Sequence, residues 1–165
     1  MRLLLGLGGN ISSPEEAFRA ALLRLGLKHQ ILALSRLYRT RPVGPEQPDF
    51  FNLAAVLDLG CPPYEFLESC RRLEADAGRD RASEQRWGPR VLDLDLLLAE
   101  SVVCRGPSLV LPHPRFHERA FALAPAAEVA SDWTHPLLGL TVGDLADDAL
   151  RADPNAIIEV LSFEF

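Results

Sequence analysis

Cysteine is scarce in this sequence, and the few that occur follow no recognisable pattern. Cys61, Cys70 and Cys104 are three, an odd number, and no two of them form a C-x-x-C pair. Small secreted domains are stabilised by paired cysteines, and structural zinc sites use closely spaced ones. The sequence therefore indicates neither a disulfide framework nor a zinc site, and a reducing cytoplasm is the expected location.

Long apolar runs and an excess of positive charge are also lacking. No apolar segment approaches the roughly 20 residues that a membrane-spanning helix needs. The short apolar start, residues 1–10, has no small-residue cleavage site and is expected to be a strand. The formal net charge is −6, which argues against non-specific binding to nucleic acid. We expect a soluble, single-domain protein over residues 1–165, without a nucleic-acid or membrane partner.

The most informative stretch that is present joins a basic, aromatic turn to an acidic strand. The alternation in residues 91–98 predicts a strand with Asp93 and Asp95 on one face. Two such carboxylates, roughly 6–7 Å apart, can share one or two Mg²⁺ ions and leave room for substrate phosphates. The alternative is an edge strand with solvated charges. The leucines of the other face favour a buried central strand, where unpaired carboxylates would be costly: Leu92, Leu94, Leu96 and Leu98.

Arginines surround this acidic strand in the sequence. Arg86 and Arg90 flank a Gly-Pro turn, and the guanidinium fork matches phosphate oxygens in a bidentate way. Trp87 adds a flat apolar face. Arg79 and Arg81 precede this turn in a charged segment, which is either a solvated surface or a lid that closes on an anion.

The remaining pattern predicts an α+β fold. A helix begins at Ser13, where Glu16 is placed to complete a capping box. The order strand, helix, strand, strand, helix, strand is a ferredoxin-like split βαβ pattern, with helices packed on an antiparallel sheet in α/β/α layers. The other expected elements are strands at 30–39, 51–59, 102–103 and 156–161, a loop at 40–49, and helices from residue 62, at 119–129 and at 142–151.

Two further polar residues each allow two interpretations. Asn52, near the start of a predicted strand, is either a strand-end cap or a ligand contact. His113 lies between two prolines, so it either closes a turn or serves as a placed hydrogen-bond donor.

With these segments in place, the chain resembles the 6-hydroxymethyl-7,8-dihydropterin pyrophosphokinase family over nearly its whole length. Members of this family move a pyrophosphoryl group from ATP to the pterin hydroxymethyl group and release AMP. The most specific part is Arg-Trp-Gly-Pro-Arg at 86–90, followed by Leu-Asp-Leu-Asp at 92–95. The others are Gly-Gly-Asn at 8–10, residues 35–40 and 42–44, Phe-Phe-Asn at 50–52, residues 78–81, and Pro112-His113 with Arg119 and Phe121.

The resemblance implies roles for particular residues and a monomer that meets only small-molecule partners. Asp93 and Asp95 would hold two Mg²⁺ and act in catalysis with Arg79, Arg81 and Arg90. The pterin would contact Thr40, Pro42, Val43, Phe50, Asn52, Trp87 and Phe121. ATP, the co-substrate, would contact Arg71, Glu74, Arg79, Arg81, Arg86, Trp87, Arg90, Leu96, His113 and Arg119.

The chain departs from the family pattern at four positions. Gly9 replaces a serine, Arg71 stands where a glutamine is frequent, and Phe50 stands where a tyrosine can occur. Ser108 occupies a position that is an arginine in some members. Two other functions use similar residues: a nucleotidyltransferase with the same aspartate pair, and a nucleotide-binding domain without turnover.

Overall fold

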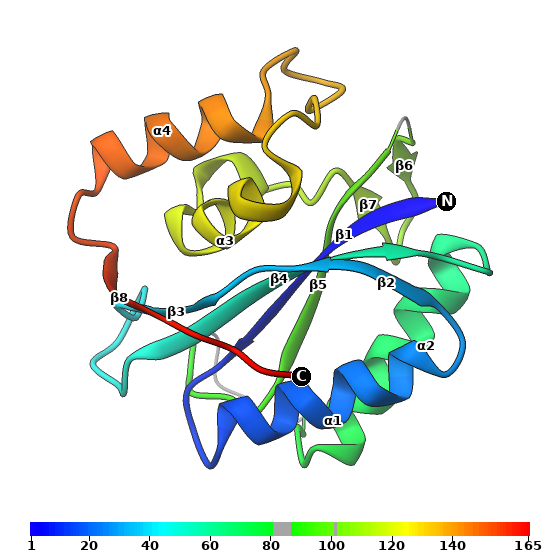
Figure 1. The fold of residues 1–165 in the computed structure, drawn as a ribbon, viewed down its shortest axis with the longest axis horizontal. Coiled ribbons are helices and arrows are strands. Elements are labelled where there is room, and N and C mark those ends of the chain that lie inside the picture. Colours follow the sequence, from blue (N-terminus) through cyan, green and yellow to red (C-terminus); the bar gives the residue numbers. More distant parts are fainter. Residues whose placement is uncertain (81–86, 101) are drawn as a thin grey trace.

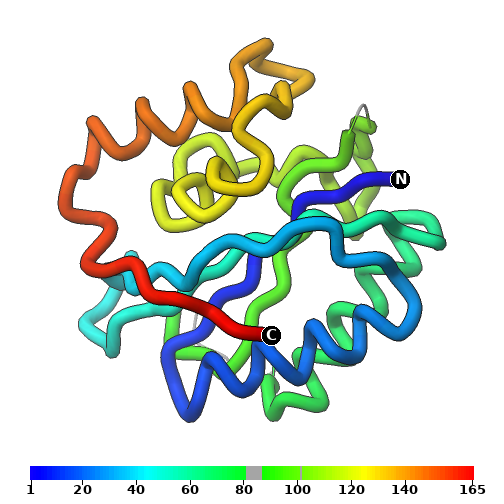
Figure 2. Tube along the Cα trace, viewed as in Figure 1, coloured from blue at the N-terminus to red at the C-terminus, as the bar shows by residue number. Residues whose placement is uncertain are grey.

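A six-stranded antiparallel sheet lies between two pairs of helices in the computed structural model, which describes residues 1–80, 87–100 and 102–165. Helices α1 and α2 cover one face, and α3 and α4 cover the other (Figures 1 and 2). The elements are β1 (Arg2–Gly9), α1 (Pro14–Gly26), β2 (Gln30–Leu34), β3 (Leu37–Thr40), β4 (Phe50–Asp58), α2 (Pro63–Asp76), β5 (Asp93–Ala99), β6 (Cys104–Arg105), β7 (Val110–Leu111), the 3₁₀ turn η1 (Phe116–Glu118), α3 (Ala120–Ala130), α4 (Val142–Ala152) and β8 (Ile157–Leu161).

The strand order confirms the predicted ferredoxin-like α+β fold. The order is β5-β1-β4-β3-β8, and β2 also pairs with β4. One predicted strand, 30–39, is divided into β2 and β3. Ser35 lies at the break, where its backbone N–H donates to the Ala54 carbonyl and its hydroxyl accepts from the Ala54 N–H, both at 2.9 Å. Ser35 therefore keeps the chain hydrogen-bonded to β4 at the point where the regular strand pairing is interrupted.

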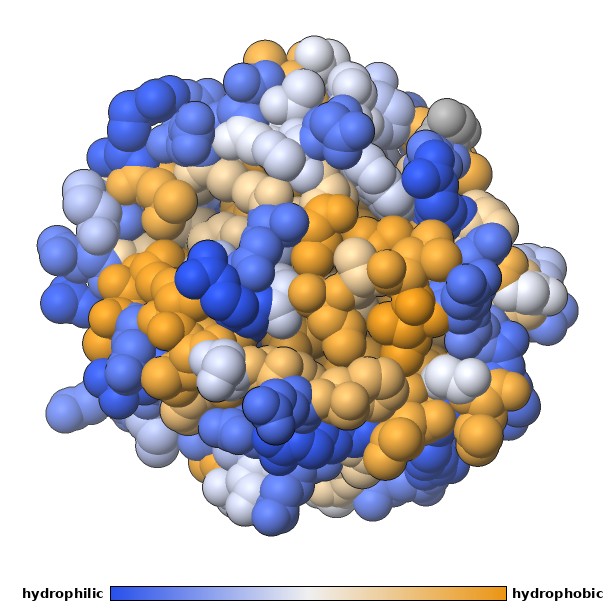
Figure 3. Space-filling model, in the orientation of Figure 1, coloured by the Kyte–Doolittle hydropathy of each residue, from blue (hydrophilic) through white to orange (hydrophobic). Residues whose placement is uncertain are grey.

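Alternation along β1 supplies both apolar layers. Leu3, Leu5 and Leu7 pack with α1 and α2, whereas Leu4 packs with α3 and α4. Side chains of successive strand residues point to opposite faces, so one strand can serve two cores. The outer surface over α4 is hydrophilic, while apolar residues gather near the sheet edge formed by β2 and β8 (Figure 3).

The acidic strand β5 departs from the prediction in two respects. It ends the hydrogen-bonded order, so it is a buried edge strand rather than a central one. Its register also shifts, because Leu4 pairs with Leu98 but Leu5 pairs with Leu96. A β-bulge of this kind inserts one residue and reverses the facing of the residues after it. Leu98 therefore packs on the α3 side, and its predicted place with Leu96 was wrong.

Two local predictions were also wrong. Ser13 precedes α1 but makes no side-chain capping hydrogen bond; the capping box is at α4, where Thr141 and Asp144 bond reciprocally. The short strand expected at 102–103 is displaced to Cys104–Arg105, because that segment pairs with β7.

The carboxylate of Glu128 connects helix α3 with strand β3. Glu128 of α3 accepts a hydrogen bond from the Tyr38 hydroxyl of β3 at 2.8 Å and from the Arg36 Nε at 3.1 Å. Burial, followed by this bond, raises the pKa of Tyr38 to about 12. The helix that carries Phe121 is thus fixed to the strand that carries Thr40.

We expect Tyr38→Phe to lower the free energy of unfolding by about 1–2 kcal/mol, because a hydrogen bond to a charged group is lost while the ring is kept. Urea unfolding at pH 7 measures this change. Tyr64→Phe is the matched control, since Tyr64 is 43% exposed. Equal stabilities of the two variants would contradict the role assigned to Tyr38.

Candidate active site

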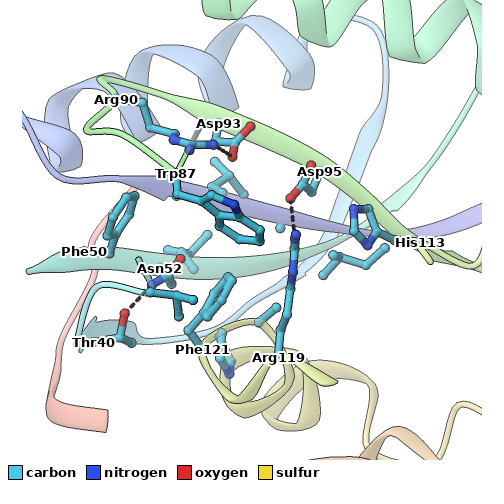
Figure 4. A pocket seen from close by; sticks show the side chains of 18 of the residues that line it. Thr40, Phe50, Asn52, Trp87, Arg90, Asp93, Asp95, His113, Arg119 and Phe121 are labelled. Carbon is cyan, nitrogen blue, oxygen red and sulfur yellow. Dashed lines mark hydrogen bonds and ion pairs between the residues drawn. The ribbon is translucent and has the colours of Figure 1, made fainter. Parts of the chain in front are cut away.

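A cavity of ≈ 250 Å³ opens on the α3 side of the sheet. Its floor includes Gly6 and Gly8 of β1, and its walls come from β3, β4, β5, the turn after Trp87 and the start of α3 (Figure 4). Most of the predicted site residues meet here: Thr40, Val43, Phe50, Asn52, Arg79, Trp87, Arg90, Asp93, Asp95, His113, Arg119 and Phe121.

The two aspartates face the same cavity, as the alternation predicted. Asp93 accepts hydrogen bonds from Arg79 and, at 2.7 Å, from Arg90. Asp95 lies 3.4 Å from Arg119 Nη1. Burial raises the pKa of Asp93, but Arg79 and Arg90 outweigh burial, and the pKa falls below its ordinary value. Burial and the charge of Asp93 raise the pKa of Asp95 to about 7.

This donor set fits Mg²⁺. Within the described part of the chain, no three His, Cys, Asp or Glu side chains are grouped to hold a metal ion. Mg²⁺ commonly uses only one or two carboxylates and completes its octahedron with water and substrate phosphates. The charge of a cation would also offset the repulsion that raises the pKa of Asp95. Asp93 and Asp95 therefore suit an ion shared with a nucleotide.

Arg79 supports Asp93 from behind. Its side chain is 4% exposed and is paired with Glu74 at 2.9 Å and with Asp93. Glu74, itself 1% exposed, also accepts a hydrogen bond from the Leu94 N–H at 2.8 Å. Both interpretations of this segment, a solvated surface and a lid, were therefore wrong for Arg79, which is a buried cation at the cavity wall.

Two other arginines offer charge to a ligand. Arg90 pairs with Asp93, and its guanidinium carbon is 6.0 Å from the Phe50 ring centroid. The Nε of Arg119 is buried and has no hydrogen-bond partner among the described residues. A buried donor without an acceptor, beside two carboxylates, fits a phosphate oxygen.

His113 is a neutral donor in this arrangement. Its Nδ1 accepts a hydrogen bond from the Arg115 backbone N–H at 3.2 Å, so the ring proton lies on Nε2. Burial, assisted by the charge of Arg119, lowers the pKa of His113 to about 4. His113 lines the cavity, and its Nε2–H can donate to a ligand at neutral pH.

An amide and a hydroxyl lie beside three aromatic rings at the other end of the cavity. Asn52 Nδ2 donates to Thr40 Oγ1 at 2.8 Å, and both residues are buried. Phe50, Trp87 and Phe121 surround this pair (Figure 4). A flat heterocycle with a polar edge matches these groups, because aromatic walls take its faces and an amide reads its edge.

Glycine in β1 leaves room for this end of the cavity. Gly8 pairs with Asn52 on one side and with Asp93 on the other. A Cβ at Gly8 would lie 3.1 Å from Asn52 Oδ1. The Gly-Gly-Asn motif, a weak signal in the sequence, thus has a steric reason at Gly8.

Two residues that the sequence analysis assigned no role hold the loop after β3. Asn10 donates to Gln47 Oε1 and the Pro48 carbonyl, both at 3.0 Å, and accepts from the Arg90 N–H at 2.8 Å. Gln47 Nε2 donates to the Trp87 carbonyl at 2.7 Å. Asn10 was visible only as part of a motif, and Gln47 gave no signal.

Six other predicted residues are not among those that line the cavity in the described part of the chain. Arg71 is exposed and pairs with Glu68 at 2.6 Å. Leu96 is buried in the core beneath α1 and α2, and neither Glu74 nor Pro42 is among the lining residues. Arg81 and Arg86 lie outside the described residues. Contacts of all six with substrate stay predictions.

Comparison with known proteins agrees with this geometry. The model of the 7,8-dihydro-6-hydroxymethylpterin-pyrophosphokinase family matches residues 4–131. The chain is 39% identical to the 2-amino-4-hydroxy-6-hydroxymethyldihydropteridine pyrophosphokinase of Methylorubrum extorquens, over 96% of this chain and 98% of the relative. It is 40% identical to that of Bacillus subtilis, over 76% of this chain and 75% of the relative. The chain belongs to this pyrophosphokinase family.

Solved structures support the fold. The chain superposes on the Plasmodium falciparum HPPK-DHPS triple mutant with STZ-DHP at a TM-score of 0.70 and 13% identity, covering 96% of this chain and 44% of that one. It matches the wild type with SDX-DHP at 0.65 and 14% identity, covering 93% and 45%. This pyrophosphokinase therefore spans less than half the length of those solved chains.

We expect Gly8→Ala to raise the dissociation constant of the pterin about two- to tenfold, which corresponds to the loss of one neutral hydrogen bond. The reason is that the new methyl group displaces Asn52. Isothermal titration calorimetry measures this constant. Gly26→Ala is the matched control, since its Cβ would make an ordinary 3.7 Å contact with Ile31. Unchanged pterin affinity in Gly8→Ala would argue against this steric role.

We expect the loss of ATP affinity in His113→Ala to be constant between about pH 6 and 8.5. A histidine with its pKa lowered to about 4 is neutral throughout that pH range. It becomes protonated only at more acidic pH. An ordinary histidine would gain charge near pH 6 and contribute more there. The ratio of ATP dissociation constants of variant and parent checks this, and a ratio that grows toward pH 6 would refute a neutral His113.

Proposed function

We propose that this cavity catalyses the family reaction, transfer of pyrophosphate from ATP to 6-hydroxymethyl-7,8-dihydropterin, the pyrophosphokinase step of folate biosynthesis. One observation carries the proposal. Asp93 and Asp95, a cluster of arginines, and an aromatic slot with a buried amide all line one cavity. The carboxylates therefore stand where a triphosphate and a planar alcohol would meet.

The pterin occupies the slot beside Asn52 and Thr40. Its ring system lies among Phe50, Trp87 and Phe121, and the Asn52 amide reads the polar edge. The hydroxymethyl group then points along the floor toward the two aspartates, since Gly8 connects Asn52 with Asp93 in the sheet.

ATP occupies the charged end. Arg90 and Arg119 donate to phosphate oxygens, and neutral His113 adds a hydrogen bond from Nε2. Two Mg²⁺ held by Asp93 and Asp95 would supply charge neutralisation of the phosphates. Arg79 keeps Asp93 ionised and oriented, with no direct role in proton transfer.

Transfer itself is a displacement at the β-phosphorus. The pterin hydroxyl oxygen forms the new bond to the β-phosphorus, the bond between that phosphorus and the oxygen bridging to the α-phosphate breaks, AMP leaves, and the hydroxyl proton passes to water. Such transfers need positioning and charge stabilisation more than covalent help from the protein. The same carboxylate pair could serve a nucleotidyltransferase, which would release pyrophosphate, so the identity of the leaving product separates the two reactions.

The setting of the enzyme is also a proposal. The chain acts as a single catalytic domain and a monomer in the cytoplasm, with small-molecule partners only. No helix in the described residues has the length and apolar character needed to cross a membrane.

We expect Asp95→Asn to reduce turnover about a hundredfold or more, because a group that stabilises transition-state charge is lost. Turnover is measured by chromatographic detection of the AMP formed from ATP and 6-hydroxymethyl-7,8-dihydropterin in the presence of Mg²⁺. Asp148→Asn, an exposed carboxylate on α4, is the matched control. Full turnover of Asp95→Asn, or release of pyrophosphate by the parent, would contradict the proposal.

A further inference from the structure

One exposed arginine contacts the cavity wall from outside. Arg115 precedes η1 and does not line the cavity. Its guanidinium carbon lies 4.8 Å from the Trp87 ring centroid, closer than Arg119, which is 6.0 Å away. A guanidinium within about 6 Å of an indole face is attracted by the ring quadrupole. Arg115 is therefore stacked on a residue that lines the substrate cavity.

Trp87 contacts two residues that are distant from it in the sequence, Gln47 and Arg115. Its backbone adopts φ 64°, a left-handed conformation that a bulky residue rarely takes. The Gln47 side chain donates a hydrogen bond to the Trp87 carbonyl and so acts on the backbone, whereas the Arg115 guanidinium contacts the indole ring itself.

Arg115 is itself held in place. Its Nε lies 3.2 Å from Glu118 Oε2, so the guanidinium is anchored on one side while it stacks on the other. Its backbone N–H donates to His113 Nδ1. One residue thus contacts the tryptophan wall through its side chain and the histidine through its backbone.

We propose that Arg115 is a positioning residue for the pterin: its guanidinium holds the Trp87 indole in the orientation that forms the wall of the pterin slot. This inference rests on the proposed function. A side-chain substitution removes the stacking and keeps the N–H that orients His113. The effect should therefore be larger for the pterin than for ATP.

The fluorescence of Trp87 reports the stacking directly. The chain has two tryptophans, so Trp133→Phe leaves Trp87 as the sole emitter, and difference spectra of the otherwise native chain serve if that background folds poorly. In Arg115→Ala we expect greater quenching of Trp87 by acrylamide and a pterin KM raised about two- to fivefold. The KM for ATP should change less than the KM for the pterin, kcat should stay unchanged, and Arg115→Lys should restore part of the pterin affinity.

Arg151→Ala is the matched control. Arg151 is exposed and pairs with the acid three residues earlier, Asp148, much as Arg115 pairs with Glu118. If Arg115→Ala shows the same acrylamide quenching of Trp87 and the same pterin KM as Arg151→Ala, the proposal is overturned. A parallel loss of pterin and ATP affinity would also overturn it, because that indicates a general or nucleotide-side defect. Absence of turnover in the parent would instead defeat the proposed function, and the quenching experiment would still test the stacking.

Discussion

The site is organised around the electrostatic repulsion between two carboxylates on one face of a buried strand. Asp93 and Asp95 are two residues apart on β5, and each raises the cost of ionising the other. The chain resolves this unequally. Two arginines bond to Asp93 and keep it charged, whereas Asp95 meets a single arginine at 3.4 Å and has its pKa raised to about 7. Asp95 is therefore the carboxylate whose charge the proposed Mg²⁺ would offset.

The strand beside β5 is shaped by the same condition. Gly6 pairs with Asp95, and Gly8 pairs with Asp93. Side chains of directly paired residues lie on the same face, so any larger residue at these positions would project into the space between the carboxylates and the pterin slot. Leu5 and Leu7 of β1, which alternate with these glycines, fill the core on the opposite face. Strand β1 thus contributes apolar side chains to the core on one face of the sheet and leaves space for the cavity on the other.

Local patterns predicted what depends on neighbours in the chain. Alternation placed both aspartates on one face, and the order of elements gave the split βαβ topology. The register shift in β5 could not be predicted, because a bulge depends on pairing with β1 rather than on the sequence of β5 alone. Arg79 was misplaced for a similar reason. Its burial depends on Glu74 and on Asp93, 14 residues away, and a charged segment by itself resembles a solvated loop.

The cavity therefore has a rigid side and a side built from loops. Asn52, Asp93 and Asp95 belong to hydrogen-bonded strands whose relative register is fixed, so the distance between the amide that reads one substrate and the carboxylates that face the other is set by the sheet. Trp87 and Val43 come from irregular segments, and the Gln47 side chain holds the Trp87 carbonyl. In-line displacement tolerates little error in the approach of the nucleophile. The amide and the carboxylates that set this approach are on the sheet, while the irregular segments contribute apolar walls at Trp87 and Val43 and the phosphate-binding groups of Arg90 and His113.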